Sequence, residues 1–307
     1  SIHPKHITEF PSFDIKNRKI TDKDIAELNS DDLFGEWTTQ GESLKSKFQN
    51  AKPFGHIVID NFLRSDVAEK AYQHFPTNYD DWHKYENPLE VKYAFDDINK
   101  IDSSIRDIFL ALSSEKLIKA FSQISGIEDL EYDPCLHGAG LHSHPRNGRL
   151  NIHLDYEKHP LLTNKERKLN IILYLTKGWK SEWNGDNQLW DKKLTQPIVK
   201  TEVKFNRAII FQTNNKSWHG LPEKILCPIG EYRKSLAYYY ISDLVTKPNK
   251  NKVGNDGSGH RLKATYVQHP HYPKNEKLQE FIDIRPKRRI EKEDIERIWP
   301  EWNPQEF

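Results

Sequence analysis

From about residue 130 to residue 245, short runs of apolar or alternating residues follow one another, separated by residues that favour turns. Several short strands at such spacing are typical of an antiparallel β-sandwich or β-barrel. We therefore predict a mainly β core in this region. The candidate strands are RLNIHLDY (149–156), KLNIILYLTK (168–177), NQLWD (187–191), PIVKTEVKF (197–205), RAIIFQT (207–213) and RKSLAYYYIS (233–242).

The first half of the chain is different, because several of its apolar residues recur at helical spacing. Thr21 is a candidate N-cap with Asp24 in the first turn, and Gly126 is a natural end for a helix that breaks near Ser113. These patterns predict an α+β protein. We expect helices over residues 21–34, 65–75 and 103–126, a strand over 55–63, and a charged helix over 287–299.

The amino-acid composition argues against several classes of protein. A chain of 307 residues with 36% hydrophobic residues and a net charge of +1 gives no general electrostatic reason to bind nucleic acid or an acidic membrane surface. The two cysteines, Cys135 and Cys227, lie far apart, so we expect no disulfide framework. No apolar stretch reaches 18 residues, and the first ten residues lack a signal-like apolar run. We expect a cytoplasmic protein without a membrane span.

One His-x-Asp sequence occurs in the chain, at His153 and Asp155. With 14 histidines and 22 aspartates in 307 residues, 14 × 22/307 gives about one such pair by chance, so the motif alone carries no meaning. Side chains alternate along a strand, which places His153 and Asp155 on one face and the intervening apolar residues on the other. On one face, an imidazole and a carboxylate can bind the same cation. A local hydrogen bond on a polar strand face is the alternative.

His219 is the candidate for a third ligand. It lies 66 residues after His153, directly beyond the candidate strand 207–213, and precedes Gly220. Two histidines and a carboxylate form the facial triad of non-haem Fe(II) oxygenases, which leaves metal positions open for substrate and oxygen. A turn residue beside Trp218 is the alternative reading of His219.

Arg233 opens the last candidate strand, and alternation places it on one face with Ser235 and Tyr239. A buried arginine needs an anionic partner, and a carboxylate matches its guanidinium in a bidentate manner. Tyr174, which shares a face with Asn170 on the strand 168–177, would add a hydroxyl to the same carboxylate. A structural salt bridge of Arg233 remains the alternative.

Together these segments are similar to the Fe(II)/2-oxoglutarate-dependent oxygenases, in particular to the prolyl 4-hydroxylase-like branch. The resemblance covers roughly residues 51–245. It implies a double-stranded β-helix, a jelly-roll or cupin-like fold with helices packed on one sheet. The matching segments are PFGHIVIDNFL, GAGLHSHPRNGRLNIHLDY, RKLNIILYLTKGW, NRAIIFQTNNKSWHG and YRKSLAYYY.

The resemblance also implies roles for single residues. His153, Asp155 and His219 correspond to the Fe(II) ligands, and Arg233 to the residue that binds the distal carboxylate of 2-oxoglutarate. Ser235 completes an Arg-x-Ser sequence, and Tyr174 corresponds to a tyrosine that commonly binds the same carboxylate. We further expect three residues to line the pocket, namely His142, Asn170 and Tyr239.

The implied function is a dioxygenase that uses Fe(II), 2-oxoglutarate and O₂ to hydroxylate an unactivated C–H bond and releases succinate and CO₂. Asp155 stands where halogenating relatives carry a small residue, so hydroxylation is favoured. NGDNQLWD (184–191) lacks the Gly-Gly pair that relatives usually carry before LWD, which leaves the substrate open: a small molecule, a glycan or a peptide. The alternatives are a peptidyl prolyl 4-hydroxylase proper, or a non-catalytic metal- or carbohydrate-binding jelly roll.

We expect an N-terminal polar and helical extension (1–50), an oxygenase domain (51–245) and a C-terminal extension with a loop and a charged helix (246–307). The C-terminal extension either covers the site or mediates homodimerisation. Its basic sequence RPKRR (285–289) is expected to be a solvated face rather than a nucleic-acid site. His142 and His144 are placed on a loop, where one of them lines the pocket or both are exposed. His159 is expected to face solvent, because Pro160 ends the strand.

Overall fold

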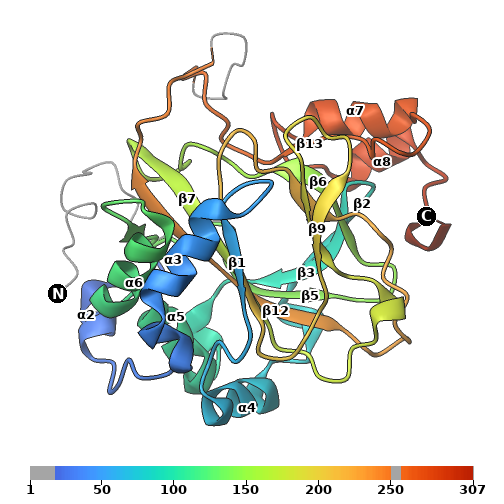
Figure 1. The fold of residues 1–307 in the computed structure, drawn as a ribbon. Coiled ribbons are helices and arrows are strands. Elements are labelled where there is room, and N and C mark those ends of the chain that lie inside the picture. The colour runs from blue at the N-terminus through green and yellow to red at the C-terminus, as the bar shows by residue number, and fades with distance from the viewer. Residues whose placement is uncertain (1–17, 250–256, 307) are drawn as a thin grey trace.

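The computed structural model describes residues 18–249 and 257–306 (Figure 1). In these residues, 13 antiparallel strands join in a single sheet that curls into a nearly closed barrel. The strands are β1 (His56–Ile59), β2 (His83–Asn87), β3 (Glu90–Phe95), β4 (Glu131–Tyr132), β5 (Gly140–His144), β6 (Arg149–Leu154), β7 (Lys165–Tyr174), β8 (Asn187–Trp190), β9 (Pro197–Thr201), β10 (Ala208–Gln212), β11 (His219–Leu221), β12 (Arg233–Asp243) and β13 (Thr265–Tyr266).

The main path through the sheet runs in the order β1-β10-β7-β12-β5-β3-β6-β11-β8-β9. Strands β2, β4 and β13 lie off this path and pair with β3, β12 and β6, respectively. Apart from β8 and β9, neighbours on this path are not consecutive in the sequence, as expected for a jelly roll rather than for a meander of consecutive hairpins. The predicted α+β fold with a double-stranded β-helix core is confirmed.

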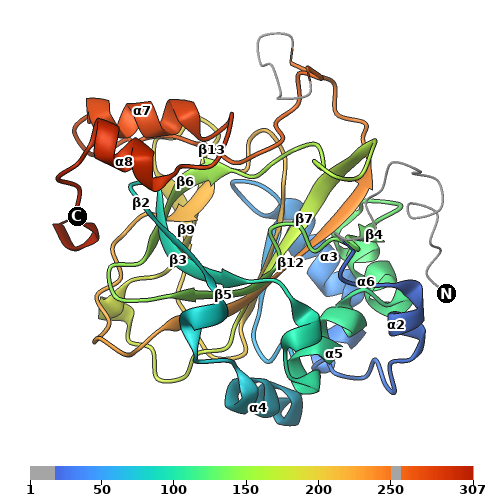
Figure 2. The ribbon, with the colours of Figure 1, turned by 180° about the vertical axis from the view of Figure 1, so that it is seen from behind.

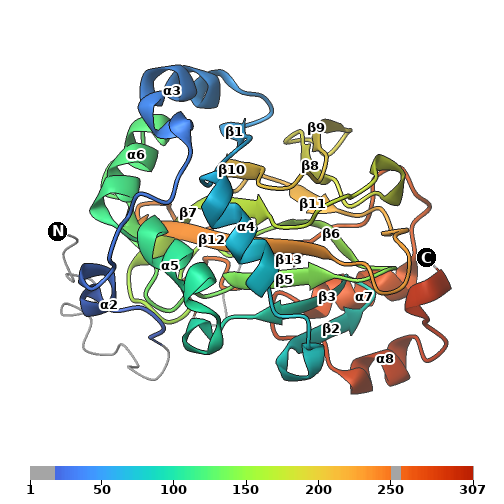
Figure 3. The same cartoon turned by 90° about the horizontal axis from the view of Figure 1, so that it is seen from below.

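Helices of the first half of the chain cover one side of the barrel, and two C-terminal helices lie on the other side (Figure 3). The helices are α2 (Asp22–Ala26), α3 (Gly41–Asn50), α4 (Ser65–His74), α5 (Ser103–Leu112), α6 (Glu115–Ser125), α7 (Glu276–Ile284) and α8 (Lys292–Ile298). Short 3₁₀ turns are η2 (Glu36–Thr39), η3 (Tyr79–Asp81), η4 (Ile98–Lys100), η5 (Ser181–Trp183) and η6 (Pro304–Glu306). None of the helices in the described part of the chain is long and apolar enough to span a membrane.

Local signals fixed several helix ends as predicted. Thr21 and Asp24 form a reciprocal capping box at the start of α2, although this helix has only five residues. The long helix predicted over 103–126 is broken at Ser113, and Ser114 caps α6 through its hydroxyl. Gly126 ends α6 with a φ of 74°, a left-handed conformation in which a residue without a Cβ is favoured.

The largest apolar core lies between these helices and the outer face of β7, β10 and β12. On β12, Leu236, Tyr238 and Tyr240 enter this core, whereas Arg233 and Ser235 line the interior of the barrel. Burial of the apolar face therefore fixes the strand register and aims the polar face inward. The alternation predicted for this strand is correct.

The C-terminal segment packs against the barrel instead of extending away from it (Figure 2). β13 adds to the edge of β6, with Thr265 opposite Leu154 and Tyr266 opposite His153. Tyr266 also belongs to a separate apolar cluster in which Phe281 of α7 and Ile298 of α8 meet Leu89 of the β2–β3 turn. This cluster anchors α7 and α8 beside the end of the barrel that β2, β3 and β6 form.

Candidate active site

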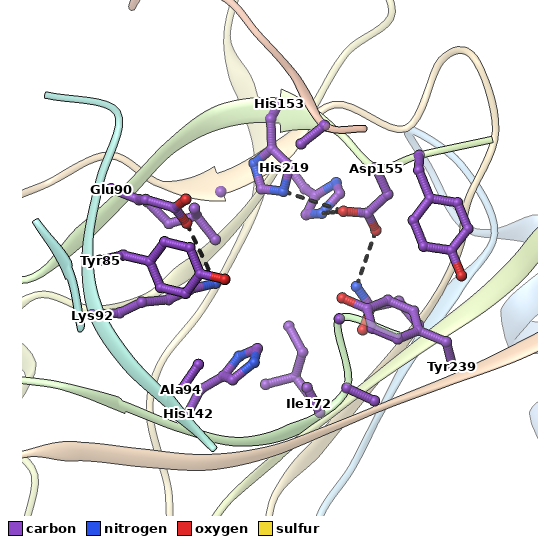
Figure 4. Close-up of a pocket in the computed structure, with 18 of the residues that line it drawn as sticks. Tyr85, Glu90, Lys92, Ala94, His142, His153, Asp155, Ile172, His219 and Tyr239 are labelled. Atoms are coloured by element: carbon purple, nitrogen blue, oxygen red, sulfur yellow. Dashed lines mark hydrogen bonds and ion pairs between the residues drawn. The ribbon is translucent and has the colours of Figure 1, made fainter. Parts of the chain in front are cut away.

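Three buried side chains converge at one end of the barrel interior: His153, Asp155 and His219 (Figure 4). His153 lies on β6, directly opposite His219 on β11, and Asp155 follows β6 immediately. One oxygen of Asp155, Oδ1, lies 3.3 Å from His153 Nε2 and 3.5 Å from His219 Nε2. The sequence predicted these residues as a group, and the structure brings them together.

The hydrogen bonds of the two imidazoles determine which ring nitrogen is unprotonated and directs its lone pair toward the carboxylate. His153 Nδ1 lies 2.8 Å from the carbonyl oxygen of Asn151, and His219 Nδ1 lies 2.7 Å from that of Ser217. A carbonyl oxygen only accepts, so each Nδ1 carries the proton and donates it. In the neutral rings, both Nε2 lone pairs then point toward a carboxylate oxygen. A cation at this point satisfies all three groups, so the residues fit a metal ion.

The surroundings of His153 and Asp155 favour the protonation states in which these side chains bind a metal ion. Burial lowers the pKa of His153, which keeps the imidazole neutral. Burial opposes ionisation of Asp155, but His219, His153 and Arg167 hold the pKa of its carboxyl well below its usual value. Metal binding requires a neutral imidazole and an ionised carboxylate, and the protein supplies both.

Two further side chains, Asn170 and Arg167, hold the other oxygen of Asp155 on the side away from the histidines. Asn170 Nδ2 lies 3.4 Å from Asp155 Oδ2, and Arg167 Nη1 lies 3.7 Å from the same atom. The Arg167 guanidinium is stacked between two rings, 3.7 Å from the centroid of Tyr156 and 3.3 Å from that of Tyr239. These contacts restrict the carboxylate to one orientation.

Arg233 lies elsewhere in the same cavity and is fully buried. Its Nε donates to the carbonyl oxygen of Gly185 at 2.7 Å, and its Nη2 donates to the Tyr174 hydroxyl at 3.2 Å. Within residues 18–249 and 257–306, its guanidinium forms no ion pair with a carboxylate. A buried cation without a counter-ion is costly, so this geometry fits an anionic ligand in the cavity.

The remaining predicted residues also line this cavity, which has a volume of about 440 Å³. Ser235 lies opposite Tyr174 on one neighbouring strand and His142 on the other. Asn170 and Tyr239 are cross-strand neighbours on β7 and β12. The interior face therefore contains every residue that was expected to line the pocket: His142, Asn170 and Tyr239.

Two expectations about histidines are wrong. His142 and His144 lie on strand β5 rather than on a loop, and both line the cavity, because pairing with β12 and β3 places β5 in the centre of the sheet. His159 is 2% exposed and does not face solvent. It is buried because its Nε2 donates to Asp133 at 3.0 Å, while its Nδ1 accepts the backbone N–H groups of Leu161 and Leu162.

The cluster of Asp133, Cys135 and His159 also has three side chains of the types that bind metals. Asp133 additionally accepts the backbone N–H groups of Cys135 at 2.8 Å and His137 at 3.1 Å. Both nitrogens of His159 are also used, and burial raises the pKa of the Cys135 thiol. The hydrogen bonds of these groups are satisfied within the protein, so the cluster is structural.

One wall of the cavity was missed at the sequence level. The β2–β3 hairpin supplies Tyr85, Glu90 and Lys92, and alternation in HKYENPLEVKYAF around its Asn-Pro turn is the signal that could have found it. The segment after β12 supplies further residues. Two of them, Arg285 and Arg289, come from the basic sequence RPKRR. Arg289 is exposed, as expected for a solvated face, and both residues also line the cavity.

Comparison with known proteins places this geometry in a family. Residues 139–241 match the model of the 2OG-Fe(II) oxygenase superfamily, and this segment contains the candidate triad, Tyr174 and Arg233. Over these residues, 139–241, the chain is similar to the 2OG-Fe(II) oxygenase superfamily. The family uses Fe(II) and 2-oxoglutarate, and the converging triad of this oxygenase is the candidate site for the iron.

Solved structures similar to the oxygenase include prolyl hydroxylases at low identity. A prolyl hydroxylase from Trichoplax adhaerens, in complex with a hypoxia inducible factor peptide fragment, is 16% identical, with a TM-score of 0.50 over 69% of this chain and 96% of that one. A Pseudomonas putida prolyl-4-hydroxylase is 15% identical, with a TM-score of 0.49 over 65% of this chain and 97% of that one. The first likeness supports the fold alone. No curated protein sequence matches the chain.

Proposed function

We propose that this oxygenase hydroxylates an unactivated C–H bond of a small-molecule, sugar or peptidyl substrate and releases succinate and CO₂. One observation carries the proposal. Two imidazole lone pairs and the Asp155 carboxylate converge in the cavity that also contains Arg233, which has no carboxylate partner within the described residues. The cavity thus offers a cation site together with an anion site, which is what an iron-bound 2-oxo acid with a second carboxylate requires.

In this proposal His153, Asp155 and His219 hold the iron on one side. The carbonyl oxygens of Asn151 and Ser217 fix the rotation of the two rings, and Asn170 with Arg167 fixes the carboxylate. Arg233 and the hydroxyls of Tyr174 and Ser235 bind the distal carboxylate of 2-oxoglutarate. Iron, when bound, supplies the chemistry that couples oxidative decarboxylation of 2-oxoglutarate to oxidation of the substrate.

The protein's own contribution is orientation and exclusion of water. Tyr174 is fully buried and packs with Phe211 and Ile209 behind the Arg233 guanidinium. Burial strengthens the attraction between Arg233 and a carboxylate, because the surrounding medium is less polarisable than water. The planar guanidinium of Arg233 matches a carboxylate in a bidentate manner, which holds the co-substrate in one orientation.

Anaerobic addition of Fe(II) and 2-oxoglutarate tests the proposal directly. We expect a weak visible absorption band when both are present, and conversion of 2-oxoglutarate to succinate when air is admitted. The band should disappear in Asp155→Ala. A non-catalytic jelly-roll protein would bind a metal ion without forming succinate, so absence of succinate under iron-replete aerobic conditions would contradict the proposed activity.

A further inference from the structure

The C-terminal segment forms one wall of the cavity. Tyr266 on β13 packs its ring 5.1 Å from the ring of His153, measured between centroids. Further residues of this wall come from the chain just before β13 and from the segment that follows α7. The segment contributes six lining residues: Leu262, Lys263, Ala264, Tyr266, Arg285 and Arg289.

Three of these residues are cations that have no carboxylate partner in the described part of the chain, and we call them the basic wall: Lys263, Arg285 and Arg289. Arg285 is half-buried, and its Nη1 is buried without a hydrogen-bond partner among the described residues. The neighbouring Arg288, in contrast, has a carboxylate partner. Arg288 binds Asp294 through two short hydrogen bonds of 2.6 and 2.7 Å on the outer side of the same segment.

The carboxylates of the cavity do not neutralise the basic wall. Asp155 belongs to the triad, and Glu90 lies 3.5 Å from Lys92 (Figure 4). Asp96 is exposed and forms no ion pair with the basic wall in the described residues. The cavity therefore has an excess of positive charge beyond Arg233, on the wall that continues from Tyr266.

The three cations also repel one another. Burial lowers the pKa of Lys263, and the charges of Arg285 and Arg289 lower it further. Lys263 and Arg285 are half-buried and Arg289 is exposed. Like charges on one cavity wall destabilise the protein, and an anion between them relieves the repulsion. Arg285 offers a planar guanidinium suited to a carboxylate or a phosphate, and Lys263 offers a point charge.

We propose that the basic wall binds an acidic group, a carboxylate or a phosphate, on a small substrate whose oxidised carbon lies at the triad. This rests on the proposed function, because the wall and the triad share one cavity. A volume of about 440 Å³ fits a small molecule, within the range of roughly 300–1,000 Å³ that ligand pockets usually have. Arg233 remains available for 2-oxoglutarate, so the acidic group is a second anion in the same cavity.

Calorimetric titration of anions into the full-length protein tests this proposal. The protein is loaded with Zn(II), which supports no oxygen chemistry, and saturated with 2-oxoglutarate so that Arg233 is occupied. Inorganic phosphate and malonate are then titrated separately, which distinguishes a phosphate-bearing substrate from a carboxylate-bearing one. We expect saturable binding of at least one anion.

Variants then locate the binding. Arg285→Gln and Lys263→Gln should each weaken anion binding by about tenfold or more, because each removes a charge-assisted hydrogen bond. Arg285→Lys should retain most of it. Lys292→Gln is the matched control, since Lys292 is an exposed cation of the same C-terminal segment that does not line the cavity. If Arg285→Gln does not fold, Arg289→Gln replaces it.

The outcomes are distinct. Absence of saturable binding of both anions by the unmodified protein would overturn the proposal, as would equal affinities in Lys263→Gln, Arg285→Gln and Lys292→Gln. The visible band with Fe(II) and 2-oxoglutarate is recorded for the same variants and should be unchanged. Loss of that band in the unmodified protein would instead contradict the proposed function and leave the anion measurement valid.

Discussion

His153 and His219 face each other across the pairing of β6 and β11, with their ring centroids 4.3 Å apart. The two residues are separated by 66 positions in the sequence, yet they form a direct cross-strand pair. A shift of one residue in either strand would turn one imidazole out of the cavity. The register of this pairing shifts between His219 and Leu221, directly beside the site.

Replacement of Asp155 by alanine should weaken Fe(II) binding by at least about 100-fold, because it removes the negatively charged member of the triad. Mutation of groups that only orient ligands already costs roughly 10–100-fold in affinity. Anaerobic titration of Fe(II) measures the change. Glu182→Ala is the control, since Glu182 is exposed and lies outside the cavity. Equal iron affinity in Asp155→Ala and the unmodified protein would show that another group binds the metal.

Replacement of Arg233 by alanine should raise the concentration of 2-oxoglutarate required for half-maximal turnover by about 10–100-fold. The loss corresponds to a charge-assisted hydrogen bond worth roughly 1.5–3 kcal/mol. Lys234→Ala is the matched control, because Lys234 points to the opposite face of β12, toward the rings of Tyr72 and Phe75. Succinate formation as a function of 2-oxoglutarate concentration provides the measurement. If Arg233→Ala requires the same concentration of 2-oxoglutarate as the unmodified protein, another cation binds the distal carboxylate.

The buried His144 should make the protein less stable in mild acid. Burial, reinforced by Arg233, lowers the pKa of His144 well below its usual value. In the unfolded chain its pKa is about 6.5, so below that pH the unfolded state binds a proton that the folded state does not. The free energy of unfolding then falls as pH falls, by about 1.4 kcal/mol for this group between pH 7.5 and pH 5.5.

Urea unfolding at the two pH values measures this effect. His144→Phe should reduce the loss of stability between pH 7.5 and pH 5.5 by about that amount, because the variant cannot take up the proton. A difference between His144→Phe and the unmodified protein that does not depend on pH would contradict the prediction.

Asp133 should be important for stability rather than for iron binding. It is fully buried, and although burial opposes its ionisation, His159 holds the pKa of its carboxyl at about 2. Asp133→Ala leaves the N–H groups of Cys135 and His137 and the Nε2 of His159 without their acceptor. We expect a loss of about 3 kcal/mol in the free energy of unfolding.

Chemical denaturation of Asp133→Ala and of the exposed-site variant Glu128→Ala, each followed by Fe(II) titration of the folded protein, separates the two roles. The expected result is a large loss of stability for Asp133→Ala with iron affinity retained. A stoichiometry of two metal ions in the unmodified protein that falls to one in Asp133→Ala would show instead that this cluster binds a metal.

The sequence was most informative where one strand separates core from cavity. On β12 the alternation of Arg233 and Ser235 with Leu236 and Tyr238 was sufficient to orient the strand, because burial of the apolar face allows only one register. β6 was less regular: Leu150 lines the cavity together with His153, although strict alternation would place it on the opposite face. The irregular pairing of β6 with β11 changes which side chains of β6 face the cavity. Such irregularities have no clear sequence signal.

Other parts of the site could not be predicted because they depend on contacts between distant segments. β5 has only five residues, and its place between β12 and β3 depends on pairing with both. Arg285 and Arg289 reach the cavity because Phe281 and Ile298 pack against Leu89, which lies about 200 residues earlier in the chain. The division of the chain at residues 50 and 245 remains a prediction, although the segment after β12 is packed onto the barrel through β13.

Because a single continuous segment that follows the last core strand builds the basic wall, the cavity can change its preferred substrate without altering the strands that carry the triad. Exchange of residues 257–298 between related chains would transfer charge selectivity as one unit. The segment is nevertheless paired with β6, the strand of His153, through Thr265 and Tyr266. The basic wall and the metal ligands therefore lie on different segments that share the edge of β6, and a graft must preserve that edge to be functional.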